Sequence, residues 1–251
     1  MRNYEIYKKY DNYEEYKYNI NPLAHKLAPY KPFIIFISSL IFLYIVYYIF
    51  TLPTATGRYT EKLNYHYNPR QKNLTKEEQT YLAPKLRVTG YNKTFCRNLT
   101  LYPQAEYTIV ARVISKGKYN WDSRSVFIPY DLGLAWGYAG DPFYTDLVQY
   151  WNRSRRLNIM SCSDIIDSND LQCYVANVHV IPATTNLRRC LGSLKKGDIV
   201  LLQGYLVNAT WEDFSYNFYT TNTSLTRTDQ GDGACETMYI QKIMVNQKIY
   251  Q

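Results

Sequence analysis

The chain has 251 residues with a formal net charge of +8, and 46% of its residues are hydrophobic. This length allows one domain with a real core beside any tail or membrane segment. The basic residues are scattered, and the only dense cluster is Asn152–Arg156, which argues against a nucleic-acid-binding surface. A solvated basic face, or attraction to anionic lipid headgroups, accounts for the charge more simply.

Residues 1–32 form a tail in which tyrosines alternate with charged residues. Pro22, Pro29 and Pro32 exclude a long helix there. We expect this Tyr-rich tail to lie in the cytoplasm, where it offers contacts to other subunits of a membrane assembly.

Residues 33–52 are twenty consecutive positions without a charge, Gly or Pro. As a helix they would span about 30 Å, the thickness of the hydrocarbon core of a bilayer. No Ala-x-Ala site follows, so the segment predicts an uncleaved signal anchor held in the lipid bilayer. Lys and Arg are nearly balanced on its two sides, but all five cysteines follow it. We therefore expect a cytoplasmic N-terminus and an extracytoplasmic domain, in the periplasm if the source is bacterial.

Residues 53–84 are polar and predict a linker. Within it, Thr75 and Glu78 have the spacing of a capping box, so a short helix is expected to begin there. Residues 85–251 predict a domain that is mainly β, because runs of alternating, β-branched and aromatic residues recur without any βαβ repetition.

The expected strands are joined by one helical segment and one sharp turn. Gly204 lies within the clearest strand and predicts a bulge or bend, as barrel corners require. The pattern favours a small β-barrel with a capping helix, and an OB-like barrel is one topology compatible with it. The expected strands are Ala105–Lys116, Ser125–Pro129, Tyr174–Pro182, Ile199–Ala209, Phe214–Thr221 and Glu236–Val245, and the expected helix is Thr184–Lys196.

Four stretches carry a family resemblance. The most specific is Ser224–Glu236 (SLTRTDQGDGACE), and the others are Tyr130–Gly137 (YDLGLAWG), Asn177–Ala183 (NVHVIPA) and Lys196–Leu206 (KGDIVLLQGYL). Together with the N-terminal anchor they resemble a family of uncharacterised bacterial membrane-anchored proteins. The resemblance implies an envelope protein with one extracytoplasmic domain of unassigned activity. The long tail and a cysteine-flanked insertion at 162–173 depart from the family pattern.

Cys235 and His179 are the sharpest candidates for catalysis. A thiolate beside an imidazole acts as nucleophile and base, with Asp229 or Asp131 orienting the histidine. The alternative is that Cys235 is a buried small residue or a disulfide partner and that His179 only packs within its strand. Spacing along the chain does not decide between these interpretations.

The remaining candidates concern binding and structure. Arg227 and Asp131 are candidates for a ligand contact or for a pair that fixes a loop, and Trp136 is a candidate for ligand stacking or for the core. Asp229 and Asp232 superficially match a calcium loop, but their spacing favours a tight turn. No Cys-x-x-Cys pair is present, so we expect no metal site and no cofactor. Cys162 and Cys173 bracket a polar insertion and are candidates for a disulfide.

The sequence favours a non-enzymatic envelope protein whose β domain binds a protein partner or an envelope component. No catalytic or cofactor motif is convincing enough to displace that hypothesis. The alternative from another class is a Cys/His-dependent hydrolase that acts on an envelope substrate. A structure in which Cys235 and His179 meet would favour the hydrolase.

Overall fold

The computed structural model describes residues 30–161, 166–226 and 233–251. Cys162, Arg227, Asp229 and almost all of the predicted tail therefore lie outside the described residues. The chain divides into two compact units, residues 1–52 and residues 53–251, and each is considered by itself.

In the first unit, helix α3 (Lys31–Thr51) coincides with the predicted apolar span. Pro32 lies in its first turn, where a proline costs no hydrogen bond. The hydroxyl of Ser39 donates to the carbonyl oxygen of Ile35 at 2.8 Å, so this polar group is satisfied within the helix. Among the described residues, α3 is the one helix long and apolar enough to cross a membrane. It is compatible with a single-pass membrane anchor.

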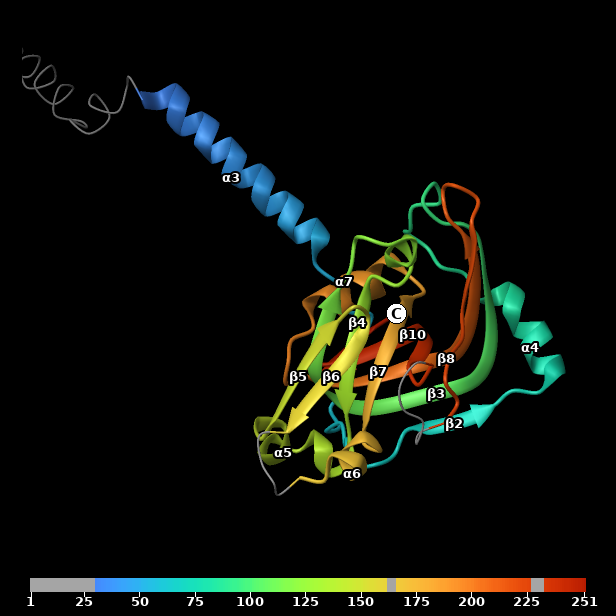
Figure 1. Cartoon of the computed structure of the whole chain (residues 1–251). Helices are drawn as coiled ribbons and strands as arrows, with labels where there is room; N and C mark the ends of the chain where they lie inside the picture. The colour runs from blue at the N-terminus through green and yellow to red at the C-terminus, as the bar shows by residue number, and fades with distance from the viewer. Residues whose placement is uncertain (1–29, 162–165, 227–232) are drawn as a thin grey trace, which may run out of the picture. The chain divides into compact units, whose positions relative to one another are not determined.

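The second unit is mainly β, as predicted, and five of its strands form its centre (Figure 1). These are β3 (Arg97–Lys118), β4 (Tyr130–Ala135), β7 (Val175–Pro182), β8 (Ile199–Glu212) and β10 (Glu236–Val245). The pairs β3–β4, β4–β7, β3–β8 and β8–β10 are antiparallel, whereas β7–β10 is parallel. Each of the five strands therefore pairs with two of the others. Figure 1 shows β3 and β8 as long, curved, neighbouring strands.

Smaller elements extend this centre. A hairpin of β5 (Val148–Arg153) and β6 (Arg156–Ser161) is inserted between β4 and β7, and α7 (Thr185–Ser193) connects β7 to β8. The other strands are β1 (Gly57–Arg58), β2 (Arg70–Asn73), β9 (Phe218–Thr221) and β11 (Lys248–Tyr250). The other helical elements are α4 (Lys76–Leu82), η2 (Ala83–Lys85), η3 (Ser123–Val126), η4 (Gly137–Gly140), α5 (Pro142–Asp146) and α6 (Ser168–Gln172).

Residues 53–84 are part of the folded unit rather than a linker. β1 pairs with β11 near the C-terminus, and β2 pairs with β3. Helix α4 begins at the predicted capping box, in which the Thr75 side chain accepts from the Glu78 backbone and Glu78 caps in return. Short polar strands give little sequence signal, because their stability comes from the strand edges they cover.

The predicted bend at Gly204 has a steric cause. A Cβ at this position would lie 1.9 Å from the carbonyl oxygen of Tyr239, so only glycine allows β8 and β10 to approach so closely. Opposite it, the β8–β10 register shifts between Ile240 and Lys242. The core fills the space between the central strands and α7 with buried side chains that include Tyr107, Phe127, Trp136, Leu187 and Leu191.

Candidate active site at Cys235

The pairing register of three neighbouring strands brings the candidate residues together. Asp131 on β4 lies opposite His179 on β7, and His179 lies opposite Thr237 on β10. Cys235 precedes Thr237 by two residues, immediately before β10, and side chains two positions apart share one face of a sheet. Strand pairing therefore aligns a carboxylate, an imidazole and a thiol across one face.

These side chains are in contact. His179 Nδ1 lies 2.9 Å from Asp131 Oδ1, and Asp131 is fully buried. His179 Nδ1 makes no hydrogen bond of good geometry with any residue that the structure describes, so the contact is an ion pair. The imidazole of His179 is also close enough to the thiol of Cys235 for each group to shift the pKa of the other. Asn177 Nδ2 donates to Cys235 Sγ at 3.2 Å.

The contacts shift the two pKa values in opposite directions. Burial lowers the pKa of His179, but the contacts with Asp131 and Cys235 outweigh burial and raise that pKa to about 9. Burial raises the pKa of Cys235, yet its contacts with His179 and Asn177 bring that pKa below its ordinary value. Each group therefore favours the charged form of the other, a thiolate beside an imidazolium.

Two other cysteines differ from Cys235 in both burial and thiol pKa. Cys96 and Cys190 are completely buried, and burial raises the pKa of each thiol to about 12. Cys235 is partly exposed and has a lowered pKa. Reactive cysteines combine access with stabilisation of the thiolate, so Cys235 has the properties of a nucleophile and the other two do not.

A chain of amide hydrogen bonds holds Asn177 in place. Ser115 Oγ donates to Asn152 Oδ1 at 2.6 Å, and Asn152 Nδ2 donates to Asn177 Oδ1 at 3.1 Å. Asn177 Nδ2 also donates to the backbone oxygen of Arg155 at 2.9 Å. With its oxygen held by Asn152, the amide of Asn177 directs its N–H groups at Arg155 and Cys235. The amide is thus oriented before any reaction occurs.

The tip of the β5–β6 hairpin covers the acidic side of the site. Arg155, only 4% exposed, makes a two-pronged ion pair with Asp122, with Nε–Oδ2 and Nη2–Oδ1 distances of 2.6 and 2.7 Å. Its Nη1 lies 3.4 Å from Asp131 Oδ1, and its guanidinium donates to the carbonyl oxygen of Ile128. Asp131 therefore stands between two basic side chains, Arg155 and His179, whose contacts offset the cost of burying its carboxylate.

The structure unites three of the residues singled out from the sequence: Cys235, His179 and Asp131. Trp136 is 1% exposed and its Nε1 donates to Asn68 Oδ1 at 3.2 Å, so it belongs to the core and offers no surface to a ligand. Arg227, Asp229 and the predicted Cys162–Cys173 disulfide fall wholly or partly outside the described residues, so the roles expected of them stay predictions.

Sequence reasoning missed Asn177 and misread Arg155. Asn177 precedes His179 by two residues in a predicted strand, and the alternation of the strand could have placed it on the same face. The cluster Asn152–Arg156 was expected to be a solvated basic face, which is wrong for Arg155. Local sequence carries no sign of the distant carboxylates that allow this arginine to be buried.

Comparisons with known protein families, with curated proteins and with solved structures find no match to this chain. Among the residues that the structure describes, no three His, Cys, Asp or Glu side chains are grouped so as to hold a metal ion. The geometry of the site is therefore the basis for a functional argument.

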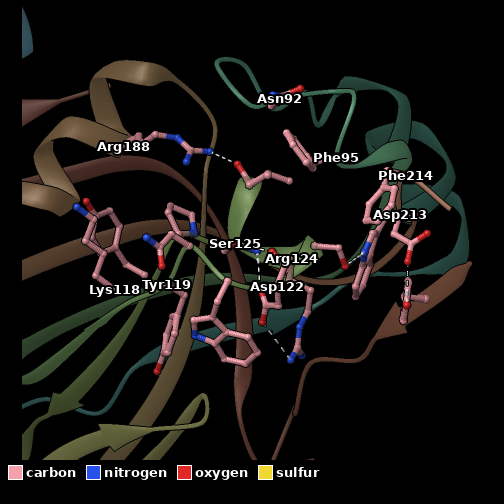
Figure 2. A pocket seen from close by; sticks show the side chains of 18 of the residues that line it. Asn92, Phe95, Lys118, Tyr119, Asp122, Arg124, Ser125, Arg188, Asp213 and Phe214 are labelled. Atoms are coloured by element: carbon pink, nitrogen blue, oxygen red, sulfur yellow. Dashed lines mark hydrogen bonds and ion pairs between the residues drawn. The ribbon is translucent and has the colours of Figure 1, made fainter. Parts of the chain in front are cut away.

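A second feature of the folded unit is an open cleft of about 900 Å³, shown in Figure 2. It is formed mainly by the β3–β4 connection and by residues from the end of β8 to β9. Lys118 and Arg188 lie on one side of the view and Phe214 on the other. Asp122, which binds Arg155, also lines this cleft.

Proposed function

We propose that residues 53–251 form a thiol-dependent enzyme that hydrolyses or transfers acyl groups. The convergence of Cys235, His179 and Asp131 from neighbouring strands is the observation that carries this proposal. The lowered pKa of Cys235 increases its fraction of nucleophilic thiolate, and the raised pKa of His179 keeps on the imidazole the proton that a leaving group needs.

The proposed reaction has two steps. The Cys235 thiolate attacks the carbonyl carbon of an ester, amide or thioester, and a new C–S bond forms. The bond to the leaving group breaks, and His179 donates its proton to that group. Water, deprotonated by the neutral imidazole, then cleaves the thioester and releases a carboxylic acid and the thiol. Asp131 keeps the imidazole oriented and stabilises its charged form.

We place the folded domain outside the cytoplasm of a bacterial cell, as part of an envelope protein that is anchored by α3 and has its N-terminus in the cytoplasm. The apolar helix, the distribution of cysteines and the resemblance of the motif at Ser224–Glu236 support this placement. The order of pairings β3–β4–β7–β10–β8–β3, with α7 between β7 and β8, supports an OB-like barrel.

A binding role is the second candidate function, as either a partner-binding module or a subunit of a membrane assembly. The exposed aromatic side chains of the cleft favour it, because aromatic side chains are typical of recognition surfaces. Purification in mild detergent tests the assembly directly: co-elution with other chains is expected, and a solitary monomer would contradict it.

The enzyme proposal is tested by labelling the detergent-solubilised protein with iodoacetamide at pH 6.5 and mapping the labelled cysteines by mass spectrometry. We expect Cys235 to react at least tenfold faster than Cys96 and Cys190 in the folded protein. An unlabelled sample of the same preparation should hydrolyse an activated ester such as p-nitrophenyl acetate with a burst of one equivalent per chain. Cys235→Ala should abolish the burst, whereas Cys190→Ala should leave it unchanged. Equal burst amplitude in Cys235→Ala would overturn the proposal.

A further inference from the structure

The acidic groups of the cleft are already used inside the protein. Asp122 is held by Arg155 through two short contacts. Asp213 accepts from the backbone of Ser215 at 2.8 Å and from the hydroxyl of Tyr219 at 3.0 Å, so it fixes its own turn. Neither carboxylate is left to neutralise a cation brought by a ligand.

The basic groups of the cleft are less completely paired. Arg188 has no acidic partner among the described residues: its guanidinium donates to the carbonyl oxygen of Val126, and its buried Nε has no hydrogen-bond partner. Lys118 is exposed on the same side of the cleft. Arg124 adds a third positive charge and lies 3.8 Å from Asp122. The cleft therefore presents an excess of positive charge.

Three aromatic side chains provide flat apolar surface beside these charges. Phe95, Trp121 and Phe214 are 51%, 65% and 62% exposed. Phe95 packs edge-on against Phe214, and Trp121 packs edge-on against Tyr119, so two aromatic pairs belong to the lining. Side chains of this size are seldom left open to water around a single hollow unless a ligand covers them.

We propose that the cleft binds an acidic saccharide, with a carboxylate on Arg188 and Lys118 and with sugar rings stacked on Trp121 and the Phe95–Phe214 pair. The amide side chains of Asn92 and Asn120, which also line the cleft, suit sugar hydroxyls as donors and acceptors. A cleft of this volume lies within the range of small-ligand sites.

Single-stranded nucleic acid fits less well, because it requires basic residues that track a phosphate backbone for several nucleotides. Here the three basic side chains gather in one hollow. This inference uses none of the chemistry of Cys235, so it stands or fails independently of the proposed enzyme.

The test is a titration of the full-length, detergent-solubilised protein followed by tryptophan fluorescence. N-acetylmuramic acid and N-acetylglucosamine are the probes, because they differ by one carboxylate-bearing lactyl group. We expect the acidic sugar to bind about tenfold more tightly, the effect of one partly buried ion pair. Lys118→Gln should reduce this preference and Arg188→Gln should abolish it, while Arg188→Lys should retain part of it.

The matched control is Phe218→Ala, because Phe218 is a 68% exposed aromatic residue on β9 that does not line the cleft. It should leave both affinities unchanged, whereas Phe214→Ala should weaken both sugars equally. Cys235→Ala should bind like the parent protein. Equal affinity for the two sugars, no binding of either at millimolar concentration, or tighter binding of AMP or tetraglutamate would each overturn the proposal.

Discussion

The Cys235 site and the aromatic cleft are two neighbouring regions built in opposite ways. The side chains of the Cys235 site lie on or directly beside paired strands, are largely buried and are bonded to one another. The cleft draws largely on connections between strands, and three of its aromatic side chains, Phe95, Trp121 and Phe214, are more than half exposed. Catalysis requires groups whose pKa values are already shifted by the fold before a substrate binds. Ligand binding instead requires surface that the protein leaves exposed to solvent.

Arg155 is the structural link between the two regions. It binds Asp122, which lines the cleft, and Asp131, which orients His179. Substitutions at Arg155, in the Cys235 site and in the cleft should therefore affect different properties, and the effects should also differ in magnitude.

The largest effect is expected for Arg155→Met. It removes the cation in closest contact with Asp122 and one of the two cationic neighbours of the fully buried Asp131, which costs about 3–5 kcal/mol in the free energy of unfolding. Urea denaturation followed by circular dichroism measures the change. The matched control is Arg153→Met, an exposed arginine on the same hairpin tip, which should change stability by less than about 0.5 kcal/mol. Similar losses in both variants would show that the ion pairs of Arg155 are not the cause.

His179→Asn should slow the alkylation of Cys235 at pH 6.5. A thiol with an ordinary pKa near 8.5 is only about 1% ionised at that pH, whereas in the parent protein the imidazolium lowers the pKa of Cys235 and so raises its thiolate fraction. The rate constant with iodoacetamide, measured from pH 5 to 10, should then follow an ordinary thiol titration. An unchanged dependence of the alkylation rate on pH would exclude a thiolate–imidazolium pair between Cys235 and His179.

The raised pKa of His179 also predicts how the free energy of unfolding depends on pH. The pKa of His179 is about 9 in the folded protein and near 6.5 in the unfolded chain, so its protonation stabilises the fold fully below about pH 6.5. This contribution is lost as the pH rises through about 9. Denaturation at pH 7 and pH 9.5 should show a larger loss in the parent protein than in His179→Asn, and equal losses would contradict the assignment.

Asn177→Ala should have a smaller effect, about a tenfold slower alkylation of Cys235 at pH 6.5. It removes one hydrogen bond to the thiolate, and a bond to a charged group contributes about 1.5–3 kcal/mol. Asn152→Ala, which acts only by releasing Asn177, should lie between this variant and the parent protein. If Asn152→Ala is the slower of the two, Asn177 does not mediate its effect.

The smallest effect on stability is expected in the cleft. Trp121→Ala removes a 65% exposed side chain and should change the free energy of unfolding by less than about 0.5 kcal/mol. A loss of several kcal/mol would show that this aromatic group supports the fold, and the contrast between the two regions would then be wrong.

Part of the fold could be predicted because some segments carry their own signal. The alternation in Glu236–Val245 predicts β10 with its observed bounds, and helix α7 lies within the expected segment. The predicted strand Ser125–Pro129 is wrong, since the Asp122 side chain accepts from the Ser125 backbone and stabilises a 3₁₀ turn instead. The predicted strand at Phe214–Thr221 begins only at Phe218, after the turn that Asp213 holds.

The sequence by itself determined that the chain has one membrane-length apolar helix and a mainly β domain, because hydrophobicity and strand alternation are local properties. It also pointed to Cys235 and His179 as chemically capable groups. Only the tertiary structure decided that the two meet, that Asp131 faces His179 and that Arg155 is buried. Those contacts depend on the register between strands that are distant in sequence, and that register is set by the packing of the whole sheet rather than by spacing along the chain.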